Sequence, residues 1–157
     1  DLGVITPDVD ELRTGWRMPG MRVLQFGFDG SPDNPHLPHN YQQDVVAYTG
    51  THDNDTTEGW YRALSPTDAR RVEHYLRAGP DDLAESMTRA VLSSVAQLAI
   101  IPAQDLLQLG SQARFNTPGT VQGNWIWRLP RGALTEALAQ RLGSLNQVYG
   151  RAREEQS

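Results

Sequence analysis

The residues best suited to chemistry lie close together in one segment, residues 49–57, which reads TGTHDNDTT. It holds one histidine, two aspartates, one asparagine and four threonines. A carboxylate such as that of Asp53 accepts hydrogen bonds from two hydroxyl groups, and a neutral imidazole such as that of His52 donates or accepts one. Such crowding of polar groups at the mouth of a pocket suits a polyhydroxylated ligand, so His52 and Asp53 are the leading site candidates.

Two other interpretations of the 49–57 segment remain open on composition alone. The segment resembles a solvated turn with Asx-type hydrogen bonds, which is as plausible as a sugar site. A calcium loop fits poorly, because Asp53 and Asp55 lack the glycine and the distal glutamate of an EF-hand. His36 and His39 form an H-x-x-H pair, but Pro38 lies between them, so a helical zinc-binding pair is not expected. We therefore expect no metal.

Aromatic residues outside this segment are weaker candidates. Phe26 and Phe28 alternate as if on one face of a strand, where most such pairs belong to the core, although Phe26 is close enough to the strand end to line a pocket. Trp125 and Trp127 occur in GNWIWRL, where aromatic residues at a spacing of two are either core or a stacking platform for sugar rings.

Short apolar strands alternate along the chain with amphipathic helices. Thr6-Pro7 and Ser65-Pro66 are helix starts, with a capping hydroxyl followed by proline at the first helical position. Asp68 stands where a capping box needs an acid, and Gly79-Pro80 breaks the helix that follows. The expected strands are 22–28, 45–48 and 97–101, and the expected helices are 7–14, 57–63, 66–78, one from about 82, 104–107 and 134–149.

This alternation predicts an α/β fold with about three parallel strands and about six helices. Three strands are too few for a doubly covered sheet, and a (β/α)8 TIM barrel has eight. The long polar loops 29–44, 49–57 and 110–129 follow strand ends, where such barrels carry their active sites. We expect residues 1–157 to be the C-terminal portion of a barrel, and therefore an incomplete domain.

Composition excludes several classes of protein. No stretch approaches the roughly 18–20 apolar residues of a membrane span. The net charge of −5 argues against nucleic-acid binding, which needs a basic face. The opening residues carry no signal-peptide pattern and do not begin with methionine, which suggests a fragment. The absence of cysteine fits the reducing cytoplasm, where we expect the protein to reside.

Six motifs follow one another along the chain: DLGVITPDVDELR, MPGMRVLQFGFDG, NPHLPHNY, YTGTHDNDTTEGWY, PAQDLLQLGSQARFNTPG and GNWIWRL. Together they resemble the amylomaltases, which are 4-α-glucanotransferases (disproportionating enzymes) of the α-amylase clan. The resemblance covers nearly the whole chain in order, and only residues 68–89 and the tail after about residue 132 are poorly marked.

The resemblance implies a (β/α)8 barrel enzyme that moves α-1,4-glucan segments between maltooligosaccharides with retention of configuration. Such a reaction uses a carboxylate nucleophile and an acid/base carboxyl about 5–5.5 Å apart. In this family a third carboxylate follows a histidine and stabilises the transition state, and His52 and Asp53 match those positions. Phe26 matches a position near the acceptor side of the cleft, and Asn116 a loop near the bound glucan. No cofactor is implied.

The resemblance also implies that the acid/base glutamate directly precedes Asp1 and that the nucleophile lies on an earlier strand. We therefore expect the parent enzyme to be a glucanotransferase and this chain alone to be inactive. The alternatives are a non-catalytic α-glucan-binding fragment and a fragment of a related α-glucan hydrolase. Because a partial barrel leaves sheet edges exposed, we also expect the isolated chain to self-associate or to be only partly ordered.

Overall fold

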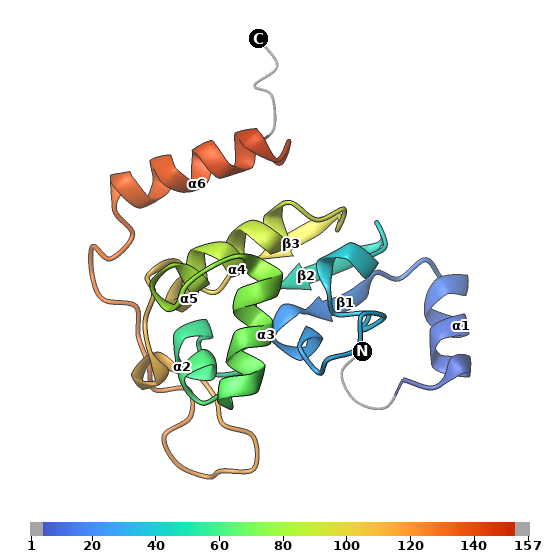
Figure 1. Cartoon of the computed structure of the whole chain (residues 1–157), viewed down its shortest axis with the longest axis horizontal. Coiled ribbons are helices and arrows are strands. Elements are labelled where there is room, and N and C mark those ends of the chain that lie inside the picture. Colours follow the sequence, from blue (N-terminus) through green and yellow to red (C-terminus); the bar gives the residue numbers. More distant parts are fainter. Residues whose placement is uncertain (1–4, 153–157) are drawn as a thin grey trace.

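A three-stranded parallel sheet lies at the centre of the molecule, whose computed structural model describes residues 5–152 (Figure 1). The strand order is β1-β2-β3, formed by β1 (Gly20–Val23), β2 (Val45–Tyr48) and β3 (Leu98–Ile100). Because β2 pairs with both neighbours in parallel, the carboxyl ends of all three strands meet at one edge of the sheet. The predicted parallel α/β arrangement is confirmed.

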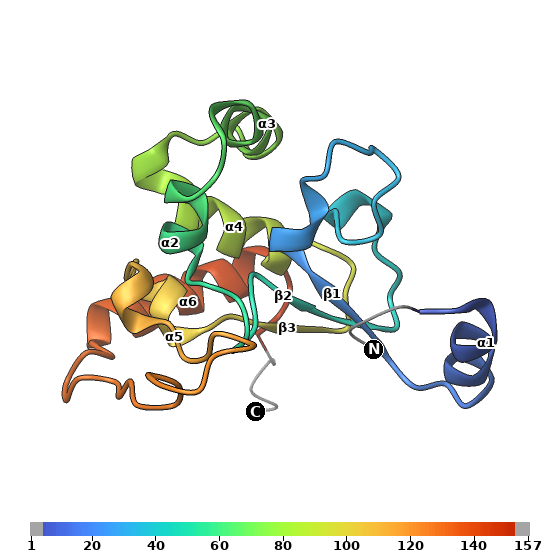
Figure 2. The same ribbon diagram turned by 90° about the horizontal axis from the view of Figure 1, so that it is seen from below.

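Six α-helices accompany the sheet within residues 5–152, in agreement with the prediction. The connection from β2 to β3 contains three of them, α2, α3 and α4, and Figure 2 shows these three on the same side of the strands. The connection from β1 to β2 contains only two short 3-10 segments, η1 (Leu24–Gly27) and η2 (Pro38–Asn40). The helices are α1 (Pro7–Gly15), α2 (Thr57–Arg62), α3 (Pro66–Leu76), α4 (Leu83–Leu92), α5 (Ala103–Leu106) and α6 (Glu136–Val148); the remaining 3-10 segments are η3 (Pro80–Asp82) and η4 (Ser111–Ala113).

Hydroxyl side chains fix the beginnings of three helices. The Ser65 hydroxyl accepts a hydrogen bond from the Asp68 backbone N–H at 3.2 Å, as its sequence context predicts. Thr56 caps α2 and Thr135 caps α6 in the same way, without a following proline to mark either position in the sequence. Helix α1 begins at Pro7 after Thr6, as predicted, but the Thr6 side chain makes no capping hydrogen bond, so the predicted cap is wrong. Helix α6 begins at Glu136 because Thr135 caps there, two residues later than expected.

The strand expected at residues 22–28 ends early, at Val23, and continues as the 3-10 segment η1. Val23 is the last residue paired with β2, and its N–H, which points away from β2, donates to His36 Nδ1 at 3.0 Å. Within η1 the Gln25 N–H donates to the Thr49 carbonyl at 3.2 Å. As a result Phe26 and Phe28 do not share one face. Phe28 is buried in the core, whereas Phe26 is 45% exposed.

The core lies between the sheet and helices α3 and α4. Val45 and Ala47 of β2 face it, together with Val72 of α3 and Met87 and Val91 of α4. The opposite face of the sheet is more open, since Leu98 and Ile100 of β3 are exposed beside their β2 partners. Parallel sheets are ordinarily covered on both faces. The open apolar face is therefore what part of a closed barrel would present on its inner side.

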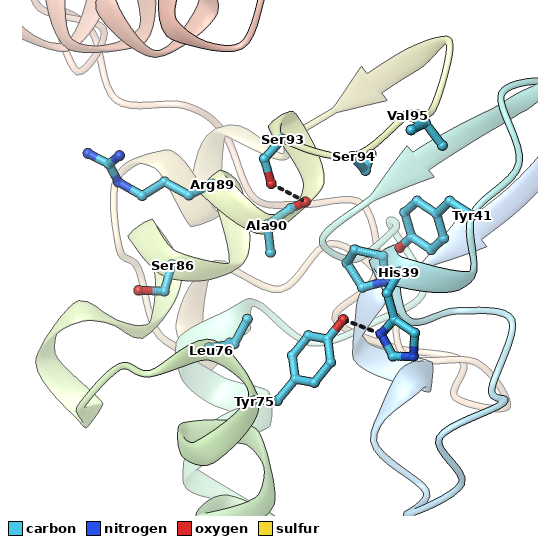
Figure 3. A pocket seen from close by; sticks show the side chains of 11 residues that line it. His39, Tyr41, Tyr75, Leu76, Ser86, Arg89, Ala90, Ser93, Ser94 and Val95 are labelled. Atoms are coloured by element: carbon cyan, nitrogen blue, oxygen red, sulfur yellow. Dashed lines mark hydrogen bonds between the residues drawn. The ribbon is translucent and has the colours of Figure 1, made fainter.

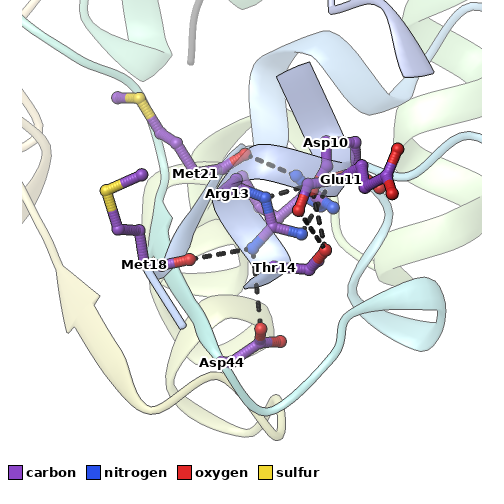
Figure 4. Close-up of polar contacts among 8 residues, drawn as sticks. Asp10, Glu11, Arg13, Thr14, Met18, Met21 and Asp44 are labelled. Carbon is purple, nitrogen blue, oxygen red and sulfur yellow. Dashed lines mark hydrogen bonds and ion pairs between the residues drawn. The ribbon is translucent and has the colours of Figure 1, made fainter. Parts of the chain in front are cut away.

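A buried arginine joins α1 to the start of the sheet (Figure 4). Arg13 Nη2 donates to the Asp10 carboxylate at 2.9 Å, whereas Nη1 donates to the Met18 carbonyl at 3.0 Å and also lies 3.5 Å from the Asp44 carboxylate. These contacts connect the helix with the residues that precede β1 and β2. Gly20 leaves room for this side chain, since a Cβ there would lie 3.3 Å from Arg13 Nη1.

A second arginine, Arg151, attaches the C-terminal end of the described residues to the junction of α4 and β3. Arg151, after α6, donates three hydrogen bonds to backbone carbonyls at the junction of α4 and β3, those of Leu92, Ser94 and Ala96, at 2.6, 3.0 and 3.0 Å. These bonds hold the end of α6 against α4. None of the helices in the described part of the chain combines the length and apolar character needed to cross a membrane.

Candidate functional site

Three of the predicted site residues meet at the carboxyl end of β2. Asn116 Nδ2 donates a hydrogen bond to Asp53 Oδ1 at 2.6 Å, and the Asn116 backbone N–H donates to the His52 carbonyl at 3.1 Å. The Nε2 atom of His52 lies 3.3 Å from the same carboxylate oxygen of Asp53. The 49–57 segment thus receives Asn116 from a loop about sixty residues later in the chain.

Arg114 joins this cluster, although the sequence did not single it out. Its Nη2 atom donates to the Asp53 carbonyl at 2.8 Å and its Nε atom to the Asn116 carbonyl at 2.9 Å. The guanidinium therefore bridges the backbones of the two segments that carry the interacting side chains. Its position two residues before Asn116 in RFNTPG is the only signal in the sequence, and that signal does not reveal its partner.

The aromatic residues form a continuous contact beside His52. The ring of Trp125 lies 5.2 Å from that of His52 and 5.8 Å from that of Phe115, and Phe115 meets Trp127 edge-on at 5.6 Å. Trp125 is 52% exposed and has a positive φ of 63°, which is uncommon for a bulky residue. Of the two interpretations of the Trp pair, a platform fits Trp125 better than a core position.

The 49–57 segment is also an ordered turn, so the sugar-site and turn interpretations are compatible. The Asn54 side-chain oxygen accepts hydrogen bonds from the N–H and the hydroxyl of Thr51, at 2.9 and 2.8 Å. These bonds run to a residue three positions earlier and are therefore not an Asx turn; the i-to-i+2 bond in this segment is that of a threonine, since the Thr51 hydroxyl accepts from the Asp53 N–H at 3.3 Å. Together they shape the backbone that carries His52 and Asp53. Farther along, the Ser111 hydroxyl donates to the Asp55 carboxylate at 2.7 Å and joins the segment to η4.

A buried carboxylate beneath the segment is a second feature that the sequence did not reveal. Asp105, in α5, is only 3% exposed and accepts hydrogen bonds from the Thr49 hydroxyl and from the Thr57 backbone N–H. Burial raises the pKa of Asp105 above its ordinary value, and the hydrogen bonds from Thr49 and Thr57 oppose part of that rise. Asp105 follows Pro102 just after β3, so it reaches the 49–57 segment from the neighbouring strand end.

Two members of the cluster, His52 and Arg114, line a hollow of about 280 Å³ together with Phe115 and Trp127, whereas Asp53 and Asn116 are not among its lining residues. A larger hollow of about 560 Å³ lies elsewhere, between α3, α4 and residues 38–41 (Figure 3). There His39 Nδ1 and the Tyr75 hydroxyl are 2.9 Å apart, and none of the predicted site residues contributes to the lining. The larger of these two hollows is therefore not the one that contains a predicted site residue.

Phe26 stands apart from the hydrogen-bonded cluster around Asp53. Its ring meets that of His36 edge-on at 5.6 Å, and it lies in η1 rather than at a strand end. His36 in turn accepts the Val23 N–H, and burial lowers its pKa. Both ring nitrogens of His39 also have protein partners, the Tyr75 hydroxyl and the Pro32 carbonyl. Over residues 5–152, no group of three or more histidine or carboxylate side chains is placed to hold a metal ion.

Comparisons with known proteins point to one family. The sequence model described as 4-alpha-glucanotransferase matches residues 1–135. The chloroplastic/amyloplastic 4-alpha-glucanotransferase of Arabidopsis thaliana is 52% identical over 155 residues, and the 4-alpha-glucanotransferase of Thermus thermophilus is 46% identical over 159 residues. Each match covers 96% of this chain but only 27% and 32% of the respective relative.

Solved structures agree with the sequence relatives. The amylomaltase of Streptococcus agalactiae in complex with acarbose aligns with a TM-score of 0.92 at 35% identity, over 98% of this chain and 31% of that one. The amylomaltase of Corynebacterium glutamicum, at 19% identity and a TM-score of 0.62, shows a similar fold. The chain thus spans about a quarter to a third of the length of these proteins, which agrees with the expected partial barrel. On the strength of the family match and the fold, this chain belongs to the 4-alpha-glucanotransferase family.

Proposed function

We propose that this chain supplies the transition-state-stabilising segment of an enzyme that transfers α-1,4-glucan segments between maltooligosaccharides with retention of configuration. The observation that carries the proposal is the arrangement of Asp53, fixed by the amide of Asn116 with the imidazole of His52 beside it. It stands at the strand ends where α/β barrels carry out their chemistry. Family membership and the acarbose complex of the Streptococcus agalactiae relative support an α-glucan as the ligand.

Asp53 is equipped to hold a sugar ring through its hydroxyl groups. One carboxylate oxygen accepts from Asn116, which sets the orientation of the side chain, and the side chain is 39% exposed. The other oxygen accepts no hydrogen bond from residues 5–152, so it can accept hydroxyl hydrogens from a ligand. Hydrogen bonds that strengthen as the ring flattens toward the oxocarbenium ion lower the barrier, because they bind the transition state more tightly than the ground state. His52 would bind the same ring.

The remaining predicted residues are assigned to the glucan around that ring. Asn116 would border the bound glucan while it orients Asp53, and Phe26 would contribute on the acceptor side. The exposed ring of Trp125 offers an apolar face against which a pyranose could stack. No metal or organic cofactor takes part in the proposed reaction.

The two carboxyl groups that would break and form the glycosidic bond are assigned, by the family resemblance, to parts of the enzyme other than residues 1–157. In a retaining reaction one acts as nucleophile and the other as general acid and then base. Asp53 takes neither role. That the isolated chain does not catalyse transfer therefore stays a prediction, as does the cytoplasmic location.

Maltotriose disproportionation by the purified chain, combined with calorimetric titration of acarbose, tests the proposal. We expect acarbose binding without glucose release, and we expect the Asp53→Asn variant to bind at least tenfold more weakly. A matched control is Asp68→Asn, which changes an exposed carboxylate at the start of α3. Equal binding by wild type and Asp53→Asn would contradict the proposed role of Asp53. Glucose release at enzyme-like rates would contradict the inactive-fragment prediction. If that glucose arises by hydrolysis alone, with no transfer to form a longer maltooligosaccharide, the hydrolase alternative would be favoured.

The open face of the sheet bears on the proposed behaviour of the chain in solution. Leu98 and Ile100 are exposed apolar residues on β3, which is an edge strand. Such an edge pairs readily with another copy. We expect sedimentation velocity to show concentration-dependent association, and a lysine at position 98 to reduce it; a sharply monomeric wild type would contradict this expectation.

A further inference from the structure

Asp105 is a buried carboxylate that the proposed mechanism does not use. It is 3% exposed, and within residues 5–152 it forms no ion pair with an arginine or histidine. Removing a carboxylate from water without a cationic partner is costly unless hydrogen bonds replace the lost hydration. The two hydrogen bonds that Asp105 does accept are therefore the feature to interpret.

Those two hydrogen bonds come from the two ends of a single segment. The Thr49 hydroxyl, directly after β2, donates to Oδ2, and the Thr57 backbone N–H, at the start of α2, donates to Oδ1 at 2.8 Å. Each oxygen of the carboxylate thus holds one end of the 49–57 segment. The residues between the two ends include His52 and Asp53.

The surroundings make this connection rigid. Thr49 and Thr57 are both fully buried, and Asp105 belongs to α5, which packs against α4 of the core. The rest of the segment is held from other directions, by Gln25, whose side chain donates to the Asp55 carbonyl at 3.0 Å, and by Ser111. Asp105 differs from Gln25 and Ser111 because its single side chain bridges both ends of the segment.

We propose that Asp105 is a positioning residue that fixes His52 and Asp53 by bridging both ends of the 49–57 segment with its two carboxylate oxygens. Its consequence for ligand binding rests on the proposed function, whereas its effect on the segment does not. A purely structural role would weaken the fold everywhere. A positioning role would instead disturb contacts on the far side of the segment, which Asp105 does not touch.

Two such contacts report the position of the segment in the full chain. The Asn116 backbone N–H donates to the His52 carbonyl, and the rings of His52 and Trp125 are 5.2 Å apart. The hydrogen bond is monitored by amide hydrogen exchange of Asn116, measured by NMR relative to the amide of Ala47 in β2. The ring contact is monitored by a nuclear Overhauser effect between the His52 and Trp125 rings.

Three variants separate the two roles. Asp105→Ala removes both hydrogen bonds, Asp105→Asn keeps the shape, and Val72→Ala opens a cavity in the core under α3 as a control for general destabilisation. In Asp105→Ala we expect Asn116 exchange to rise at least tenfold relative to Ala47, and the ring contact to disappear. In Val72→Ala both amides should change together and the ring contact should remain.

Asp105→Asn should retain most of the wild-type behaviour, with less than a threefold change. Its amide oxygen accepts the Thr57 N–H, and the Thr49 hydroxyl can reverse to accept from the amide nitrogen. If Asp105→Ala does not fold, Thr49→Val takes its place and removes one of the two connections. The proposal would be overturned if Asp105→Ala left Asn116 exchange unchanged and the ring contact intact. It would also be overturned if Val72→Ala raised Asn116 exchange relative to Ala47 and abolished the ring contact as Asp105→Ala does.

Acarbose titration of the same variants keeps the two proposals distinguishable. If wild type binds acarbose, Asp105→Ala should bind at least tenfold more weakly, and equal affinity would overturn the positioning role. If wild type does not bind acarbose, the proposed function fails for this chain. The exchange and ring-contact measurements then still decide whether Asp105 positions the segment.

Discussion

Two glycines in helices give a sharp test of the structure, because the same substitution should act in opposite directions. Gly59 in α2 and Gly143 in α6 are both helical, and helix propensity alone predicts that alanine stabilises either site by up to about 1 kcal/mol. The surroundings differ. A Cβ at Gly143 meets nothing within 4 Å, whereas one at Gly59 would lie 2.7 Å from the Asp55 carboxylate and would also collide with the Ser111 hydroxyl.

The colliding atoms at Gly59 already have partners. Ser111 donates to one Asp55 oxygen at 2.7 Å, and the Thr56 N–H donates to the other at 2.8 Å. Separating Ser111 from Asp55 removes a hydrogen bond to a charged group, which contributes about 1.5–3 kcal/mol. The lower half of that range applies because Ser111 is exposed and can bond to water instead. After the propensity gain of up to about 1 kcal/mol, we expect Gly59→Ala to destabilise by about 0.5–2 kcal/mol.

Urea unfolding of both variants at 25 °C, followed by far-ultraviolet circular dichroism, measures these free energies. Gly143→Ala should raise the free energy of unfolding by about 0.5–1 kcal/mol and Gly59→Ala should lower it, with unchanged slopes against urea concentration. If Gly59→Ala is as stable as wild type or more stable, the packing of Ser111 and Asp55 against α2 is not as described, and the placement of the 49–57 segment against η4 is refuted with it.

Three further changes test the site and its supports. Asn116→Ala removes the donor to the partly exposed Asp53, worth about 1–2 kcal/mol, so calorimetry should show the Kd for acarbose rising roughly 5–30-fold; unchanged affinity would argue against that contact. Arg151→Met keeps the apolar stem but leaves three carbonyls without their donor, and urea unfolding should show a loss of about 1–3 kcal/mol, whereas Arg131→Met in a loop should change little. Burial raises the pKa of Asp105 in the folded chain, so its contribution to stability is present below the unfolded-state pKa of about 3.9 and is lost as pH rises through the folded-state pKa. The stability of Asp105→Asn relative to wild type should therefore increase from about pH 4 toward neutrality, and a flat difference would contradict the raised pKa.

Local signals in the sequence were enough to predict most of the elements. Strand β2 was predicted with its observed bounds, and α3 begins at Pro66 as its capping serine and proline indicated. These predictions succeeded because capping, proline geometry and short apolar runs act over three or four residues. The composition of the 49–57 segment also singles out His52 and Asp53, because it depends on residue types that are adjacent in the chain; their role in binding stays a prediction.

The alternation of Phe26 and Phe28 predicted a longer strand and failed for a physical reason. A period of two indicates a strand only while the backbone groups remain in the ladder. Here the ladder with β2 ends at Val23, and the turn that follows is fixed by hydrogen bonds from Val23 to His36 and from Gln25 to Thr49, which lie 13 and 24 residues away. No local pattern contains those partners, so the turn into η1 follows from the tertiary fold.

The sequence by itself determined the kind of fold and the residues that could do chemistry; the tertiary structure decided which of them lie together. Asn116 reaches Asp53 across 63 residues, and Asp105 reaches Thr49 and Thr57 across 56 and 48 residues. These partners meet because parallel strands bring the ends of β2 and β3 to one edge of the sheet. Hydrogen bonds depend on distances in space, which neither residue type nor spacing along the chain specifies.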